Sequence, residues 1–155
     1  MIERTGDMFT TNAKILGHGV NVDGLMGAGI AKTFAEKYER NLKRYKQACK
    51  DKHLNPGGSV IVNESGTLIL NLASQSRPGR FARYDWLFSS LHGAVEKLMT
   101  QEKEVLDLFG STIAIPEIGC GIGGLEWNKA VYTILTVEKI FPKFEFEVWH
   151  YAPTS

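Results

Sequence analysis

The sequence predicts an α/β fold, a three-layer α/β/α sandwich whose central sheet is mixed but mostly parallel. Three observations support this prediction. Short apolar segments typical of buried strands alternate with longer segments of helical periodicity. Two glycine-rich segments each follow such a strand and lead into a helix. Two strands in the middle of the chain flank the turn sequence ESGT, which indicates a hairpin and makes the sheet mixed.

The first half of the chain is expected to supply four strands and two helices. Ile30, Phe34, Tyr38 and Leu42 recur at helical spacing after the first glycine-rich segment. The sequence NPGG is typical of a turn. The expected strands are 1–6, 13–20, 59–65 and 67–74, and a second, basic helical stretch covers 41–52.

The second half is expected to begin with a loop over 74–83, because Pro78 and Gly79 interrupt regular structure there. Apolar residues at helical spacing then predict a helix from Tyr84 to about Thr100. The remaining expected elements are a strand over 111–116, a glycine-rich loop over 117–127, a helix over 128–140 and a strand over 144–151.

Length and composition suit a single domain over residues 1–155. The chain is 43% apolar and 23% charged, and 155 residues can bury a core without disulfides. A net charge of +1 is too small for the protein as a whole to attract nucleic acid or anionic membranes electrostatically. A local basic patch is still compatible with this net charge. Cys49 and Cys120 lack metal-ligand spacing. We therefore expect no metal and no cofactor.

The sequence contains neither a signal-peptide pattern nor an apolar run long enough to span a bilayer. We therefore expect a cytoplasmic monomer without membrane contact.

The glycine-rich segments are suited to binding phosphate. Gly27, Ala28 and Gly29 leave little side-chain bulk at the start of a helix, where backbone N–H groups lack partners and the helix dipole is positive. Residues 119–124 repeat this arrangement before the next helix. Two such sites can hold a diphosphate if they face each other. The alternative is that these glycines only build tight turns.

Other glycine motifs are not matched. Lys32 stands where the third glycine of a Rossmann fingerprint belongs, and no Gly-Lys-Ser/Thr follows a glycine loop. Cys120 lies between two glycines, but Ile118 replaces the first glycine of a nucleophile elbow. A thiol enzyme using Cys120 is therefore only a minor hypothesis, and a small residue that permits close backbone approach is the alternative.

Three segments together resemble the macrodomain, an ADP-ribose-binding module: GDMF (6–9), HGVNVDGLMGAGIAKTF (18–34) and IPEIGCGIGGLEW (115–127). The resemblance is strongest to the branch containing the terminal ADP-ribose glycohydrolase and the yeast ADP-ribose-1″-phosphate phosphatase. It implies a macrodomain-like fold across nearly the whole chain.

The resemblance also implies a binding site. Asp7 would accept a hydrogen bond from the adenine amino group, Asn21 would contact the distal ribose, and Tyr151 would lie near the adenine. The backbone of 27–31 would hold one phosphate, and 119–124 the other phosphate and the distal ribose. The complete implied ligand-binding set is Asp7, Met8, Asn21, Met26, Gly27, Ala28, Gly29, Ile30, Ala31, Ser74, Gly119, Cys120, Gly121, Ile122, Gly123, Gly124 and Tyr151.

Two positions depart from this resemblance. Gln75 stands where the glycohydrolase branch has a catalytic lysine, and Gly123 where the glycohydrolase has its partner aspartate. Glutamine cannot form a Schiff base and glycine cannot transfer a proton. The lysine-dependent mechanism is therefore not supported.

The remaining catalytic candidates are Asn21, His18 and Asp23. Asn21 can orient water, His18 can serve as acid or base, and Asp23 can do so if burial raises its pKa. Alternatively, a phosphate of the ligand takes the proton from water. Each candidate also has a structural explanation, because His18 ends an apolar strand, Asp23 precedes a glycine in a turn, and Asn21 can cap or tolerate a left-handed backbone.

We therefore expect a protein that binds ADP-ribose and hydrolyses ADP-ribose-1″-phosphate or mono-ADP-ribosyl groups on a protein or nucleic acid. The alternative is a reader that binds ADP-ribose without turnover. Arg77, Arg80 and Arg83, interleaved with Phe81 and Tyr84, are the best place to seek contacts to a modified macromolecule, although a solvated loop is the default explanation.

Overall fold

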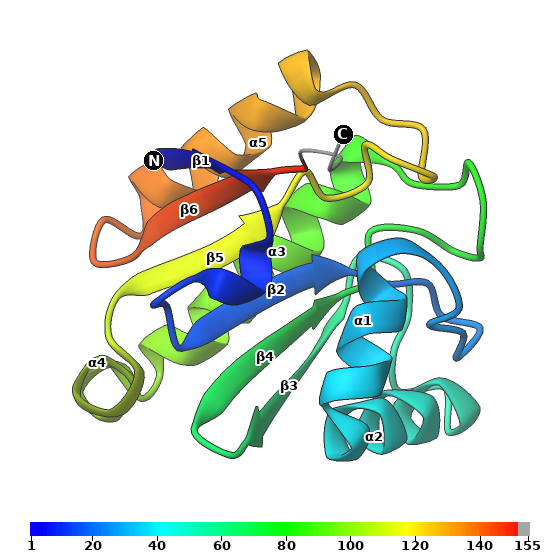
Figure 1. Ribbon diagram of the computed structural model, residues 1–155, viewed down its shortest axis with the longest axis horizontal. Helices are drawn as coiled ribbons and strands as arrows, with labels where there is room; N and C mark the ends of the chain where they lie inside the picture. Colours follow the sequence, from blue (N-terminus) through cyan, green and yellow to red (C-terminus); the bar gives the residue numbers. More distant parts are fainter. Residues whose placement is uncertain (152–155) are drawn as a thin grey trace.

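A six-stranded sheet organises the computed structural model, which describes residues 1–151 (Figure 1). The strand order is β1-β6-β5-β2-β4-β3, and every neighbouring pair is parallel except β3 and β4. The strands are β1 (Ile2–Thr5), β2 (Ile15–Gly19), β3 (Ser59–Glu64), β4 (Thr67–Leu72), β5 (Thr112–Pro116) and β6 (Glu145–His150). The predicted mixed, mostly parallel sheet is confirmed.

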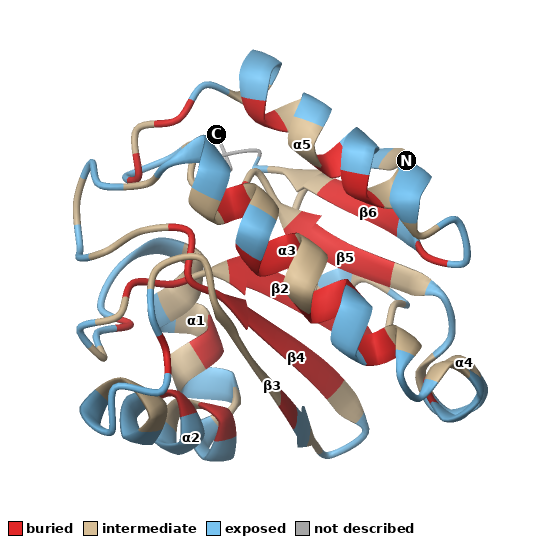
Figure 2. Ribbon diagram, turned by 180° about the vertical axis from the view of Figure 1, so that it is seen from behind, coloured by how far each residue is buried: buried red, intermediate tan, exposed pale blue. Residues whose placement is uncertain are grey.

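Helices cover both faces of the sheet (Figures 1 and 2). One face carries α1 (Gly29–Lys37) and α2 (Glu39–Lys50), and the other carries α3 (Tyr84–Met99) and α5 (Trp127–Ile140). Successive strand residues point to opposite faces. Leu70 accordingly packs in the cluster that contains residues of α3 and α5, while Ile69 packs with Phe34 of α1. The three-layer prediction is confirmed.

The predicted hairpin joins β3 to β4, where Ser65 and Gly66 adopt positive φ angles of 53° and 83°. The structure differs from the predicted elements at three places outside the sheet. The backbone leaves helical geometry at Tyr38 (φ −128°, ψ 79°), so α1 stops and α2 begins earlier than predicted. Two further elements, the 3-10 helix η1 (Met8–Thr10) and α4 (Glu102–Phe109), were not predicted.

The unpredicted α4 has a physical explanation. Val105 is its one buried residue, so its apolar stripe is too short to produce a clear helical period.

No helix within residues 1–151 combines the length and apolar character that crossing a membrane requires.

The parallel strands determine where the site lies. Because β2, β4 and β5 run in the same direction, their carboxyl ends meet at one edge of the sheet. The loop from β2 to α1, the loop from β4 to α3 and the loop from β5 to α5 all leave from this edge (Figure 1). In open α/β sheets this edge is where ligands bind.

Candidate functional site

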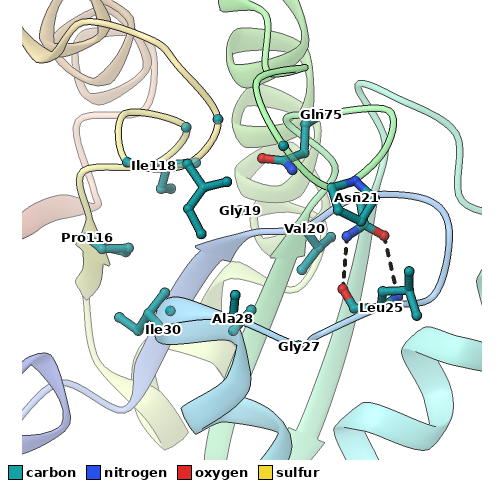
Figure 3. A pocket seen from close by; sticks show the side chains of 18 of the residues that line it. Gly19, Val20, Asn21, Leu25, Gly27, Ala28, Ile30, Gln75, Pro116 and Ile118 are labelled. Carbon is teal, nitrogen blue, oxygen red and sulfur yellow. Dashed lines mark hydrogen bonds between the residues drawn. The ribbon is translucent and has the colours of Figure 1, made fainter.

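A cavity of about 520 Å³ lies at this edge, bordered by the three loops (Figure 3). Pro116 and Ile118, from the end of β5, lie on one side of it, and Asn21 and Gln75, from the ends of β2 and β4, lie on the other. The predicted ligand-binding residues that line the cavity are Asn21, Gly27, Ala28, Gly29, Ile30, Ala31, Gly119, Gly121, Ile122 and Gly123.

The first glycine loop borders the cavity with bare backbone. Gly29 adopts a φ of 58°, which favours glycine, and side-chain carbons placed at Gly27 or Gly29 would meet nothing within 4 Å. Within residues 1–151, the backbone N–H groups from Gly27 to Ala31 have no hydrogen-bond acceptor. Neither packing nor backbone hydrogen bonding therefore explains this stretch.

The second glycine loop is folded more tightly. Leu125 donates its backbone N–H to the carbonyl of Gly119 at 2.8 Å, and a side-chain carbon at Gly123 would lie only 2.6 Å from that same carbonyl oxygen. Even so, the N–H groups of Gly119, Gly121, Ile122 and Gly123 find no acceptor in the described part of the chain. The two loops thus border one cavity and leave N–H groups free, which is the arrangement that a diphosphate requires.

Asn21 lines the cavity, but its side chain is engaged by the loop itself. Its Nδ2 donates to the carbonyl of Leu25 at 2.8 Å, and its Oδ1 accepts from the backbone N–H of Asp23 at 2.9 Å. Tyr45, buried in α2, donates its hydroxyl to both the carbonyl oxygen and Oδ1 of Asn21. This network holds the first glycine loop in place and supports the capping explanation of Asn21. The left-handed alternative is wrong, because Lys52 and Ser65 are the non-glycine residues with positive φ within residues 1–151.

His18 lies beneath the cavity and does not line it. The ring is completely buried and stacks on Phe34 with centroids 3.9 Å apart. Its Nε2 donates to Oδ1 of Asn71 at 2.8 Å, and its Nδ1 has no partner among the described residues. Burial lowers the pKa of His18 to about 4, so the ring is neutral near pH 7. This position does not fit the acid–base role considered from the sequence, because no water in the cavity can reach the ring.

Asp23 and Cys120 also lie outside the cavity lining. Asp23 is exposed on the turn that Asn21 holds and does not line the cavity, so it is not placed to act on a ligand there. The Cys120 thiol contacts the carbonyl of Ile118 at 3.5 Å. Burial, with a further contribution from the charge of Glu117, raises the pKa of Cys120 to about 11. The thiol therefore stays protonated near neutral pH and is a poor nucleophile.

Several residues implied by the resemblance are not among those that line the cavity. Asp7 caps η1 by accepting from the backbone N–H of Phe9 at 2.9 Å, and Tyr151 is exposed. Met8 and Met26 are buried in separate core clusters, and Gly124 lies behind the lining against Arg80.

Ser74 is completely buried, and its Oγ has no partner among the described residues. A side-chain carbon at Gly19 would lie 2.7 Å from this oxygen. Gly19, which lines the cavity, is therefore required for the close approach of β2 to the end of β4.

Sequence reasoning missed the apolar and turn residues that complete the lining. They lie at the ends of β2 and β5 or in the loops that follow β2, β4 and β5, and this position is the signal that could have identified them. These residues are Gly19, Val20, Leu25, Pro78, Gly79, Pro116, Glu117 and Ile118. Gln75, singled out from the sequence only as a departure from the family pattern, also lines the cavity.

Glu117 is the only ionisable side chain among the lining residues. No group of three or more His, Cys, Asp or Glu side chains within residues 1–151 is arranged to hold a metal ion.

A family model described as Macro domain matches residues 18–134 of the chain. The chain belongs to the macrodomain family. Most of its cavity lining comes from two of the segments on which the resemblance rested, 18–34 and 115–127, and Gln75, Pro78 and Gly79 complete it.

This macrodomain is similar to proteins of several kinds. A DNA ADP-ribosyl glycohydrolase of Mycobacterium tuberculosis is 24% identical over 153 residues, covering 94% of this chain and 40% of the relative. The ADP-ribose glycohydrolase OARD1 of Homo sapiens is 26% identical, covering 95% of this chain and 88% of the relative. An ADP-ribose 1″-phosphate phosphatase of Lodderomyces elongisporus is 29% identical, with 80% and 84% covered.

Solved structures show the same fold. The macrodomain of Mycobacterium tuberculosis DarG superposes with a TM-score of 0.81 at 23% identity, covering 99% of both chains. Thermosipho africanus DarTG in complex with ADP-ribose gives a TM-score of 0.74 at 25% identity, covering 97% of this chain and 42% of that one. The macrodomain spans about two fifths of the length of the DNA ADP-ribosyl glycohydrolases that it matches.

Proposed function

We propose that this macrodomain binds ADP-ribose, with the diphosphate between its two glycine loops. The observation that carries the proposal is that both loops border one cavity and leave backbone N–H groups without acceptors. The names of its relatives support the choice of ligand, because they describe enzymes that act on ADP-ribose or ADP-ribosyl groups. The cavity volume also suits a ligand of nucleotide-sugar size.

The orientation of the ligand follows from the two sides of the cavity. Pro116, Ile118 and Ile30 form an apolar side suited to a nucleobase (Figure 3). The opposite side carries the amide of Gln75 and the second N–H of the Asn21 amide, which suit the hydroxyl groups of the distal ribose. The diphosphate lies between them in this proposal.

The proposed reaction is hydrolysis at the anomeric carbon of the distal ribose. Water forms the new C–O bond, the bond to the attached group breaks, and the leaving group takes up a proton. Gln75 donates its Nε2 to the carbonyl of Arg77 at 2.9 Å, which fixes the side chain and leaves its Oε1 as an acceptor that orients the water.

No ionisable side chain of the lining lies on the side of Gln75, because Glu117 follows β5 on the other side. A phosphate oxygen of the ligand therefore takes the proton from the attacking water in this proposal, and the loop N–H groups stabilise the charge that develops.

For the group attached to ADP-ribose, the structure favours a nucleic acid. Arg77 and Arg80 lie on the loop that contributes Pro78 and Gly79 to the cavity, and neither forms a salt bridge within residues 1–151. The Arg77 guanidinium lies 3.9 Å from the ring centroid of the exposed Phe81. Cationic and aromatic side chains together bind phosphates and unpaired bases. ADP-ribose-1″-phosphate is the second candidate substrate, supported by the phosphatase relative.

Two measurements test the proposal. Calorimetry should detect ADP-ribose binding in the micromolar range, and absence of binding at tens of micromolar would refute it. Chromatography of the products should then show ADP-ribose released from an ADP-ribosylated oligonucleotide or formed from ADP-ribose-1″-phosphate. Binding without release from either substrate or from mono-ADP-ribosylated protein would identify a reader instead.

A further inference from the structure

Glu117 is the charged side chain of the cavity lining, and it needs an explanation. It follows Pro116 at the end of β5, on the side of the cavity next to β6. Its Oε1 lies 3.2 Å from Nδ1 of His150, the last residue of β6. Its Oε2 has no hydrogen-bond partner within residues 1–151. One acceptor oxygen of the carboxylate is therefore free.

A carboxylate in this cavity cannot serve the phosphates, because like charges repel each other. Where it meets the ligand, it can be stabilised only by a part that offers hydrogen-bond donors. Along the sheet, Glu117 follows β5, whereas Asn21 follows β2 and Gln75 follows β4 on the far side. The donors that Glu117 meets therefore do not belong to the reacting sugar.

From this placement we infer that Glu117 is a specificity-determining residue, whose free carboxylate oxygen accepts a hydrogen bond from the nucleoside half of the ligand. Two groups there supply such a donor, the exocyclic amino group of the base and the hydroxyl groups of the adjoining ribose. The inference rests on the proposed function, and it concerns which nucleotide sugar is chosen, whereas the loops decide that a diphosphate is bound.

His150 positions this carboxylate. Its Nε2 lies 2.9 Å from Oε1 of Glu3 in β1, so the imidazole lies between carboxylates contributed by β1 and by the end of β5. The ring also packs edge-on against Trp127, with centroids 5.6 Å apart. Contacts from three directions fix the ring, and the ring in turn limits the rotamers of Glu117.

Calorimetry on the whole protein tests the inference with ADP-ribose and three analogues. The analogues are inosine diphosphate ribose, which lacks the amino group, and the 2′-deoxy and 3′-deoxy forms of the adenosine ribose. The variants are Glu117→Gln, which keeps the shape but not the charge, and Glu117→Ala. Glu126→Gln is the matched control, because Glu126 follows the same loop but is exposed and outside the lining. Thermal unfolding confirms that each variant is folded.

We expect Glu117→Ala to weaken ADP-ribose binding by roughly 10- to 100-fold and Glu117→Gln by less, since the bond involves a charged acceptor. Wild type should bind the analogue that lacks the donor more weakly than ADP-ribose by a similar factor. Glu117→Ala should bind that analogue and ADP-ribose with equal affinity. That analogue identifies the partner group. His150→Gln should reduce the preference for ADP-ribose over the same analogue, a ratio that a purely structural role would leave unchanged.

Unchanged affinity in Glu117→Ala would overturn the inference, and so would an equal loss for ADP-ribose and all three analogues. Failure of wild type to bind ADP-ribose would instead refute the proposed function, and the inference would fall with it.

Discussion

Gln75 and Gly123 face each other across one corner of the cavity, where a side-chain carbon at Gly123 would lie 3.1 Å from Oε1 of Gln75. These are the two positions at which the sequence departs from the lysine and aspartate of the glycohydrolase branch. Their proximity means that both departures affect a single part of the site. Gly123 also has no room for a side chain, since a carbon there would lie 2.9 Å from Cβ of Ala82.

Gln75→Ala should therefore separate turnover from binding. Its Oε1 orients water in the proposed reaction, whereas the glycine loops hold the diphosphate. We expect kcat to fall by at least about tenfold and the Kd for ADP-ribose to change by less than about threefold. Gln47→Ala, on the exposed surface of α2, is the control. Equal losses in kcat and affinity would show that Gln75 contributes to binding instead.

Gly27→Glu and Gly121→Glu test each loop separately. Both positions have open space around them and neither has a positive φ, so the variants should fold normally. A carboxylate beside the diphosphate should weaken ADP-ribose binding by about a hundredfold or more. Gly93→Glu offers a matched control, because Gly93 has equally open surroundings but lies within α3. If calorimetry finds that either loop variant binds ADP-ribose as tightly as wild type, that loop does not contact the diphosphate.

Tyr45→Phe tests the network that holds the first glycine loop. The substitution deletes the hydroxyl that donates to Asn21 at 2.8 and 2.9 Å and leaves those buried acceptors without this donor. We expect the free energy of unfolding to fall by about 1–3 kcal/mol. ADP-ribose affinity should fall by only a few-fold, since the hydroxyl does not line the cavity. Tyr132→Phe, at an exposed position, should change neither denaturant unfolding nor calorimetric affinity.

His18 should make stability depend on pH. Its pKa is about 4 in the folded state, below the ordinary value of 6.5, so the unfolded chain binds a proton more readily. The contribution of His18 to the free energy of unfolding is therefore highest above pH 6.5. It falls progressively between pH 6.5 and 4, by up to about 3 kcal/mol. Denaturant unfolding of wild type and His18→Gln across this range should show the smaller decrease in the variant. If the free energy of unfolding fell equally with pH in both proteins, a group other than His18 would cause the pH dependence.

Arg77 and Arg80 should contribute to binding of an ADP-ribosylated oligonucleotide but not of free ADP-ribose. Replacing both with glutamine should weaken oligonucleotide binding by roughly tenfold and reduce its dependence on salt. Lys43→Gln with Arg44→Gln, on the surface of α2, controls for net charge. Titrations at several salt concentrations that show identical slopes for wild type and the Arg77/Arg80 variant would argue against a nucleic-acid surface here.

The layers, the hairpin and the two glycine loops could be predicted because each depends on a local signal. Alternating burial, turn residues and helical spacing are all properties of short segments. The position of the cavity followed as well, since parallel strands bring their carboxyl ends together.

Side-chain burial could not be predicted in the same way. His18 and Asn21 are three residues apart at the end of one apolar strand, yet His18 faces Phe34 in the core and Asn21 borders the cavity. Which of them meets solvent depends on the placement of α1, which is a tertiary property. The role proposed for Glu117 could not be predicted from the sequence, because it depends on the contact with His150, which is 33 residues away.

The hydrogen bonds from Asn21 and Tyr45 have a thermodynamic consequence for recognition. They order the first glycine loop during folding, so an incoming anion meets a rigid template and little conformational entropy is lost on association. Selectivity in such a template depends on its resting shape. Ligands whose phosphate spacing differs from that shape are expected to bind less tightly.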